Sequence, residues 1–395
     1  MAVYKIFPSK DATIYSLFPN MNTGLDEIIE ATETQISSTN NSNPAASRFL
    51  IQFAPDEIDN VLENIMGISS SAQLLNSQSV FPWKAELQCF VATATGLALD
   101  TTLECYPVYG DWGMGTGHYL DEPTVTNGTS WIWKDYSGSV QWLTGSFPSY
   151  ITGSYNTLYS PAGGGNWWTG SLYQNRLNSD TYPITQSQVF NYSSDKDINM
   201  DITNIVRAWY TGSISWDGLI IKQSPSSEFV NNINVQPELK FFSIDTHTIY
   251  PPQLQFSWRD YSYNPGTLTV LNQLPATLTL AQNPGFFYSG SVNRFRIYAR
   301  PEYPTQTWQT ASVYTQNYAL PSSSYYAVKD LDTNEYVINF DTQFTQLSCD
   351  SESSYFDIHM NGLEPERYYT ILVRTVVNGS TIIFNDQYSF KVING

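Results

Sequence analysis

Carboxylates are the most numerous ionisable groups in this sequence. The 395 residues include 36 Asp and Glu against 18 Lys and Arg, for a formal net charge of −18. A glycosidase needs two facing carboxyl groups, which a fold assembles without any local spacing, so the sequence leaves such a pair open. The chain has no His-x-x-x-His, Cys-x-x-Cys or Gly-x-Ser-x-Gly pattern, and its three histidines, His118, His247 and His359, are isolated. We therefore expect a protein that is not an enzyme and has no cofactor.

Three aspartates around Lys196 form a second candidate. Asp195, Asp197 and Asp201 carry the hard oxygen ligands that calcium prefers, but their spacing is not that of an EF-hand loop. A solvated turn followed by a helix cap explains them better, and we predict no metal site. The glycine-rich stretch "YGDWGMGTGH" is followed by neither a Lys nor a helical pattern, so its glycines indicate tight turns and not a phosphate loop.

Tryptophans concentrate in a region rich in Gly, Ser and Asn, between about residues 110 and 190. Flat amphipathic rings can stack on sugars or anchor a protein partner. They can equally pack long loops within the chain, and we favour packing or subunit contacts over sugar binding. The candidates for ligand or partner contacts are Trp112, Trp131, Trp133, Trp167 and Trp168.

Arginines gather on one face of a predicted strand in "NRFRIYAR". Arg294 and Arg296 alternate there with the apolar Phe295 and Ile297. On an outer sheet face they could pair with carboxylates of a neighbouring subunit. A solvated sheet face is an equally good interpretation.

The negative net charge limits the partners that the protein can bind, and the cysteines indicate the cellular compartment in which it is made. A strongly negative field repels nucleic acid and anionic membranes, so we expect neither as a partner. The amino-terminal "MAVYKIFPSKDATIYSLFP" has no long apolar run, and no later segment is predicted to span a membrane. Cys89, Cys105 and Cys349 are few and odd in number, which is typical of buried thiols in a protein made in a reducing cytoplasm.

One segment carries a helical pattern. In "DITNIVRAWYTG", Ile202, Ile205, Val206 and Trp209 recur with the spacing of one apolar helical face. Asp201 or Thr203 can cap the start of the helix, and Gly212 is placed to end it in a left-handed conformation. Because so short a helix is not stable alone, we expect it to cover a β-sandwich with Trp209 as a plug.

The other patterns predict strands, with alternation in "SRFLIQF", "KAELQCFVA", "QLQFSW" and "YFDIHM" and a hairpin turn at Asn378-Gly379. "LEPERYYTI" has the spacing of a tyrosine corner, with Leu363, Pro365 and Tyr368. We predict an all-β protein of two β-sandwich domains with one short helix. The domains are residues 1–245, jelly-roll-like, and 263–395, immunoglobulin- or fibronectin-like, and 246–262 form a linker or shared strand.

Three pieces of the first half follow one another in order: "KDATIYS" with "NTGLDEI", then "SRFLIQF", then "MDITNIVRAWYTG" with "DGLIIK". Together they resemble the DNRLRE-type β-sandwich module, which is also classed among carbohydrate-binding modules. The similarity covers roughly residues 1–245, although the stretch from Trp112 to Phe190 departs from the compact family pattern. No sugar-binding residue is therefore carried over. The matching positions are Asp11, Ala12, Thr13, Tyr15, Asn22, Gly24, Arg48, Leu50, Phe53, Asp201, Thr203, Val206, Trp209, Gly212 and Gly218.

The second half has a narrower resemblance. "FFSIDTHTIYPPQLQFSW" and "SCDSESSYFDIHMNGLEPERYYTILVRTVVNG" resemble virion structural proteins of large, contractile-tailed marine phages. The resemblance implies a non-enzymatic virion component of the neck, tail, baseplate, fibre or head surface, assembled in the host cytoplasm. Its implied partners are other virion proteins in a symmetric multicopy assembly. The alternative function is a carbohydrate- or receptor-binding component of a tail fibre, with a glycan as ligand.

Overall fold

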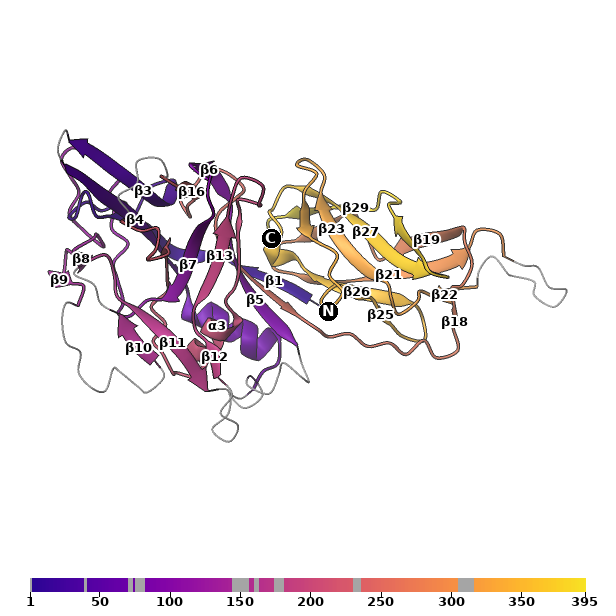
Figure 1. Cartoon of the computed structure of the whole chain (residues 1–395). Helices are drawn as coiled ribbons and strands as arrows, with labels where there is room; N and C mark the ends of the chain where they lie inside the picture. The colour runs from indigo at the N-terminus through magenta and orange to yellow at the C-terminus, as the bar shows by residue number, and fades with distance from the viewer. Residues whose placement is uncertain are drawn as a thin grey trace. The chain divides into compact units, whose positions relative to one another are not determined.

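The regular secondary structure of the chain is mainly β-sheet (Figure 1). The computed structural model describes residues 2–38, 41–69, 74, 82–143, 156–159, 163–173, 181–229, 236–304 and 316–395. These residues form several sheets connected by long loops and a few short helices, so the prediction of an all-β sandwich protein is confirmed.

Two compact units make up the chain. Unit 1 contains Met1–Lys5, Phe81–Trp83 and Phe256–Gly395, and unit 2 contains Ile6–Val80 and Lys84–Gln255. The main division, after Gln255, falls inside the segment 246–262 that the sequence analysis sets aside as a linker or shared strand. Two short pieces from the first part of the chain belong to unit 1, which local patterns do not reveal. The chain passes between the units within or next to strands β1 (Ala2–Ile6), β5 (Trp83–Cys89) and β17 (Gln253–Trp258).

Unit 2 is built around one large sheet. Its strand order is β13-β7-β15-β4-β3-β16-β6, and β2 pairs with β4 outside this path. The strands are β2 (Pro8–Tyr15), β3 (Ile28–Ser38), β4 (Asn41–Phe53), β6 (Val91–Thr95), β7 (Thr101–Pro107), β13 (Gln186–Phe190), β15 (Leu219–Gln223) and β16 (Glu238–Phe242). Strand β15 pairs on both sides and is buried along its whole length, which explains its apolar start.

Smaller sheets complete unit 2. Strand β14 (Ile198–Asp201) pairs with β5, in which Ala85, Leu87 and Cys89 point inward as their alternation predicts. The tryptophan-rich region forms β8 (Trp133–Asp135), β9 (Val140–Gln141), β10 (Asn156–Tyr159), β11 (Trp167–Tyr173) and β12 (Thr181–Pro183). This region is therefore partly a framework of short strands and not only loop.

The predicted helix is present as α3 (Thr203–Tyr210). A second helical segment follows strand β4 and has no counterpart in the sequence analysis. It consists of α1 (Pro55–Asn60) and a π-helical turn, Val61–Ile65. Pro55 in the first helical turn and the acidic Asp56 and Glu57 are typical helix-start residues, so a local signal existed.

Unit 1 is a sandwich of two six-stranded sheets. The first has the order β18-β22-β21-β26-β25 with β19 on β21, and the second has β20-β29-β27-β23-β24 with β28 on β27. The first sheet's strands are β18 (Thr269–Val270), β19 (Ala276–Ala281), β21 (Val292–Pro301), β22 (Tyr318–Ala319), β25 (Ser348–Cys349) and β26 (Ser354–His359). The second sheet's are β20 (Phe286–Tyr288), β23 (Tyr325–Asp330), β24 (Tyr336–Ile338), β27 (Tyr368–Val377), β28 (Ser380–Phe384) and β29 (Ser389–Ile393).

The inner faces of these two sheets share one aromatic core. Phe295 stacks on Phe356, whose ring also stacks on Tyr326 at a centroid distance of 4.3 Å. The inward residues of β21 and β26 are those that sequence alternation predicts. Asn378 and Gly379 both have positive φ and join β27 to β28, which confirms the predicted hairpin.

The tyrosine corner is one residue away from its predicted position. Tyr368 is half exposed on the outer face of β27, whereas Tyr369 is buried. The Tyr369 hydroxyl donates to the Glu364 carbonyl oxygen at 3.0 Å. Because successive strand residues face opposite sides of the sheet, only one of the adjacent tyrosines can make this bond, and the assignment to Tyr368 is corrected to Tyr369.

Candidate functional site

The signature helix α3 is a structural element fixed to strand β5. Thr203 Oγ1 accepts the Ala85 N–H at 2.9 Å, and the Asp201 carboxylate accepts the Thr203 N–H at 3.0 Å. The N-cap residue itself is Ile202, whose side chain makes no capping bond. Val206 and Trp209 are buried, and Trp209 stacks on Trp216 at 5.8 Å. The apolar face is thus used for packing, as predicted.

Two signature glycines act through their backbone. Gly212 follows the helix with φ of +66° in open space. Gly218 has φ of +94°, and a Cβ there would lie 2.5 Å from the Ile51 carbonyl oxygen. Both positions favour glycine for its conformational freedom, and Gly218 also for the close approach of strand β4.

Three of the five candidate tryptophans are buried inside unit 2. Trp112 donates its Nε1–H to the Asp217 carbonyl oxygen, Trp167 packs on Tyr106, and Trp168 meets Tyr109 edge-on. These rings offer no face to a ligand, so the packing alternative holds for Trp112, Trp167 and Trp168.

The other two candidate tryptophans, Trp131 and Trp133, are only partly buried. Trp131 lies against Phe229 and under the Arg48 guanidinium, and Trp133 donates to the Asn20 side chain at 3.0 Å. Both rings also have partners within their own unit. Trp131 and Trp133 therefore take part in packing within unit 2, as the three buried tryptophans do.

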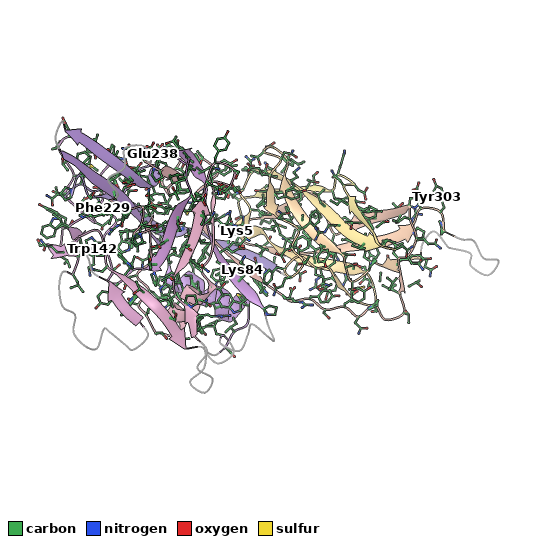
Figure 2. All side chains as sticks on the ribbon, viewed as in Figure 1. Lys5, Lys84, Trp142, Phe229, Glu238 and Tyr303 are labelled. Carbon is green, nitrogen blue, oxygen red and sulfur yellow. The ribbon has the colours of Figure 1, made fainter. Side chains whose placement is uncertain are left out.

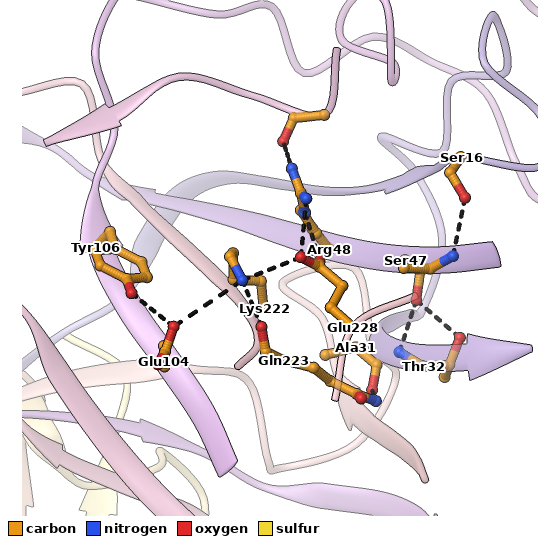
Figure 3. A network of polar contacts seen from close by, with 12 residues as sticks. Ser16, Ala31, Thr32, Ser47, Arg48, Glu104, Tyr106, Lys222, Gln223 and Glu228 are labelled. Atoms are coloured by element: carbon orange, nitrogen blue, oxygen red, sulfur yellow. Dashed lines mark hydrogen bonds and ion pairs between the residues drawn. The ribbon is translucent and has the colours of Figure 1, made fainter. Parts of the chain in front are cut away.

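A buried charge network that the sequence analysis missed holds the tryptophan region to the large sheet (Figure 3). Arg48 makes two hydrogen bonds to Glu228, at 2.7 and 3.0 Å, and its guanidinium lies 4.6 Å from the centroid of Trp131 and 5.1 Å from that of Trp167. Lys222 contacts Glu228 at 3.1 Å, and burial lowers the pKa of Lys222. Arg48 is one of the residues of the family resemblance, and the structure gives it this packing role.

Arg294 and Arg296 are neutralised within unit 1. Arg294 forms a two-bond ion pair with Asp357 on the neighbouring strand, at 2.8 and 2.9 Å. Arg296 does the same with Asp350, and this bond is the main reason that the pKa of Asp350 is well below its usual range. These arginines therefore do not present unpaired charge to a neighbouring subunit.

An acidic hollow in unit 2 is the strongest candidate for a binding site. It has a volume of about 400 Å³ and lies over strands β3 and β16. We call it the acidic pocket. It is lined by five carboxylates and one ammonium, with two tyrosines and four smaller or uncharged groups: Asp26, Glu27, Glu30, Glu33, Glu238, Lys240, Tyr15, Tyr119, Gln236, Ile28, Thr32 and Thr34.

Strand alternation builds the floor of the acidic pocket. Ile29 and Ala31 of β3 point into the core, so Glu30 points outward, opposite Lys240 on β16. Lys240 Nζ lies 3.1 Å from Glu30 and 2.7 Å from Glu238. Burial opposes the charge of Lys240, but the bonds to Glu238 and Glu30 outweigh it and raise its pKa. "LDEIIEA" shows that Glu30 lies between the apolar Ile29 and Ala31, but its cross-strand partner on β16 is visible only in the fold.

The side wall of the acidic pocket is polar and aromatic. Tyr15 and Tyr119 lie 5.0 Å apart with a 48° tilt between their rings. The Asp26 carboxylate accepts the Tyr119 N–H at 2.9 Å and lies 3.5 Å from His118, while burial raises the pKa of Asp26. Between these rings and carboxylates, the pocket suits a cationic group or a hydroxyl-rich ligand.

Behind this wall lies a buried carboxyl group. Asp11, another residue of the family resemblance, is 1% exposed and accepts the Ile244 N–H at 2.8 Å. Burial raises the pKa of Asp11 to about 7, with Asp245 and Asp26 adding to the shift. Its part is to fix β2 to the segment that follows β16.

Within the described ranges, no group of three or more His, Cys, Asp or Glu side chains is arranged to hold a metal ion. Around Asp195 and Asp197, the structure shows hydrogen-bonded turns, with Asp197 accepting the Val91 N–H at 2.8 Å. The three cysteines are buried free thiols. Of the helices in the described part of the chain, none has the length and apolar character that crossing a bilayer requires.

Comparison with known proteins leaves the family open. No protein-family model matches the chain, and no curated protein matches it. A crystal structure of a β-glucuronidase from Parabacteroides merdae is similar over 78% of this chain and 28% of that one, with 10% identity and a TM-score of 0.16. A DUF4785 family protein from Legionella pneumophila aligns over 98% of this chain and 65% of its own, with 7% identity and a TM-score of 0.16. Likenesses at this level carry no argument, and the resemblances drawn from the sequence remain predictions.

Proposed function

We propose that the protein is a non-enzymatic structural component of a phage particle that acts through protein–protein contacts, with the acidic pocket as a recognition site for a basic side chain of a neighbouring protein. The sequence resemblance of residues 240–395 to virion proteins supports the first part. The arrangement of charge in the acidic pocket supports the second part and is the observation on which the proposal mainly rests.

The acidic pocket contains more negative charge than its own cation can balance. Lys240 forms ion pairs with Glu30 and Glu238. The Glu27 side chain is 60% exposed, and among the described residues its one ion-pair partner is His247, at 3.5 Å. An ammonium or guanidinium entering the hollow would meet these carboxylates and the faces of Tyr15 and Tyr119. The ion pairs with the carboxylates and the cation–π contacts with the tyrosines both strengthen when water is displaced from a concave site.

A catalytic role fits the acidic pocket less well. A glycosidase needs one protonated carboxyl group opposite an ionised one. Glu30 and Glu238 instead share the Lys240 ammonium, and the hydrogen bond from Lys240 lowers the pKa of Glu238. The bond to Lys240 therefore favours an ionised Glu238, which attracts a cation but donates no proton to a leaving group.

Carbohydrate or receptor binding is the second candidate function. It is favoured by the tyrosine pair, since tyrosine rings beside hydrogen-bonding carboxylates also suit sugar hydroxyls and ring faces. The salt dependence of binding distinguishes the two candidate functions. Binding of a basic side chain weakens strongly with salt, whereas binding of a neutral oligosaccharide does not.

Cryo-electron microscopy of intact particles from the source, with this chain traced in the map, tests the proposal directly. We expect the chain in a symmetric position with a lysine or arginine of a neighbour inside the acidic pocket. Particles that lack the chain would refute the structural role. A chain that projects freely with an open acidic pocket would favour the carbohydrate-binding alternative.

A matched pair of charge reversals tests the acidic pocket in solution. Glu27→Lys places a cation at its rim, and Glu302→Lys makes the same net change at an exposed site in unit 1. The probe is a lysine-rich peptide, titrated at low and at physiological salt. We expect binding that falls with salt, is lost in Glu27→Lys and is kept in Glu302→Lys. If both variants lost peptide binding equally, the net charge of the protein would explain the binding. That result would contradict a specific binding site.

A further inference from the structure

Two cations on one outer sheet face of unit 1 have no carboxylate beside them. Strands β23 and β27 pair side by side (Figure 1), and their register places Arg374 opposite Tyr325. Tyr326 and Val328 of β23 point into the core. The alternate residues Tyr325 and Lys329 therefore lie on the outer face with Arg374. In the described part of the chain, neither Arg374 nor Lys329 forms an ion pair or a side-chain hydrogen bond.

Aromatic rings contact both cations. The Arg374 guanidinium carbon lies 4.9 Å from the ring centroid of Tyr325 and 4.8 Å from that of Phe340. Lys329 Nζ lies 5.3 Å from the ring centroid of Tyr336, the residue opposite it on β24. The rings of Tyr336 and Phe340 are 6.2 Å apart. These five residues form one continuous surface, which we call the cation–aromatic face.

Other cations near the cation–aromatic face do have carboxylate partners. Lys391, on the outer face of the same sheet, is bonded to Glu366. Arg367, which directly precedes β27, pairs with Asp330 at 2.6 Å. The lack of a carboxylate at the cation–aromatic face is therefore a local feature of this surface, and positive charge remains there for a ligand from outside the chain.

The charge of unit 1 permits an anionic partner. Unit 1 contains 12 Asp and Glu against 9 Lys and Arg, whereas unit 2 contains 24 against 9. Most of the excess negative charge, including Glu238 of the acidic pocket, thus belongs to unit 2 (Figure 2). The cation–aromatic face lies in the unit that is nearly balanced, where local charges decide what is attracted.

The ring contacts indicate which kind of anion fits. Sugars and nucleotide bases bind aromatic surfaces by stacking on ring faces. In the cation–aromatic face, the rings instead contact the chain's own Arg374 and Lys329. The groups left for a ligand are the N–H donors of these two side chains, and a guanidinium matches a carboxylate with two parallel bonds.

The spacing of the two cations fits an extended peptide. Arg374 is level with Tyr325, and Lys329 is four residues farther along β23, which corresponds to roughly 13 Å at about 3.3 Å per residue. Two side chains four positions apart in an extended peptide have the same separation and point to the same side. Carboxylates at that spacing can therefore reach both cations at once.

We propose that the cation–aromatic face binds an extended acidic segment of a partner protein, with one carboxylate on Arg374 and another on Lys329. Ile383, which lies opposite Arg374 on β28 and is 52% exposed, adds apolar surface for the stems of the partner's side chains. The inference concerns unit 1 and does not rest on the acidic pocket, which attracts charge of the opposite sign.

Peptide binding to the full-length protein, measured by fluorescence anisotropy at low salt, tests the proposal. One peptide has a glutamate at every fourth position, and the other has the same composition with its glutamates clustered. We expect the spaced peptide to bind more tightly. Arg374→Gln and Lys329→Gln should each weaken its binding by about fivefold or more, since each removes a charge-assisted hydrogen bond.

Lys391→Gln is the matched control, because it removes the same charge from the same sheet face at a site that already has a carboxylate. It should leave the affinity nearly unchanged, and thermal unfolding should show that all three variants are folded. Equal weakening in Lys391→Gln, equal affinity for the two peptides, or no binding to the wild type would each overturn the proposal. Tighter binding of an oligogalacturonate of the same charge would overturn it in favour of an acidic glycan.

Discussion

Arg48 and Glu228 are 180 positions apart in the sequence and form a buried, two-bond ion pair in unit 2. Their side chains are 4% and 6% exposed. Arg48 also donates to the Gly164 carbonyl oxygen and lies over Trp131 and Trp167. One guanidinium thus connects the central strand β4 to the segment after β15 and to the tryptophan region (Figure 3).

Removing one partner of this pair should destabilise unit 2 strongly. Glu228→Gln leaves the Arg48 charge buried without its carboxylate, and we expect a loss of about 3–5 kcal/mol in the free energy of unfolding. Urea titration followed by tryptophan fluorescence measures it. Asp111→Asn is the control, because Asp111 pairs with Lys10 at an 80% exposed site and should cost less than about 1 kcal/mol. Similar losses in both variants would contradict a structural role for the buried pair.

The buried carboxyl group of Asp11 should give unit 2 an unusual pH dependence. Its pKa is raised to about 7 from the usual 3.8 of an aspartate, so the folded state holds this proton more tightly than the unfolded chain does. The Asp11 contribution to stability is then complete below pH 3.8 and is lost as the pH rises to about 7.

Asp11→Asn keeps an oxygen that can accept the Ile244 N–H but removes the titration. We expect the stability difference between the variant and the wild type to change in favour of the variant as the pH rises from about 4 to 7, by a few kcal/mol at most. Unfolding free energies measured across this range for both proteins provide the test. A difference that stays constant with pH would show that Asp11 does not titrate there.

The two tyrosines at the start of β27 should respond differently to loss of the hydroxyl. Tyr369→Phe removes the bond to the Glu364 carbonyl oxygen, and we expect a loss of about 1–2 kcal/mol. Tyr368→Phe changes a half-exposed side chain and should be nearly neutral. Thermal unfolding of the pair decides the assignment of the tyrosine corner. A larger effect at Tyr368 would restore the assignment made from the sequence.

The two signature glycines provide a matched comparison of backbone strain and steric conflict. In both Gly212→Ala and Gly218→Ala, a left-handed alanine should cost roughly 1–2 kcal/mol. Only at Gly218 does the added Cβ also meet the Ile51 carbonyl oxygen, which should add about 1–3 kcal/mol. Chemical denaturation of both variants measures the difference. Equal costs would mean that strand β4 moves aside freely.

The sequence by itself determined the local features of this protein. Helix α3, the left-handed Gly212 and the Asn378-Gly379 hairpin follow from backbone preferences that act over a few residues. The inward faces of β5, β21 and β26 follow from alternation, because a half-buried strand places every second side chain in the core. The tyrosine corner was found from its spacing but placed one residue early, since two adjacent tyrosines satisfy a local pattern almost equally well.

The tertiary structure decided which side chains meet. Whether Trp112 and Trp167 face a ligand or the interior depends on strands far away in the sequence. The carboxylates that pair with Arg294 and Arg296 also come from residues far along the sequence, Asp357 and Asp350. Glu30 forms an ion pair with Lys240 only because β3 pairs with β16. Asn361 likewise donates a hydrogen bond to the Lys5 carbonyl oxygen across 356 positions of the chain. Long-range pairing brings these groups together, and no periodicity along one strand carries that information.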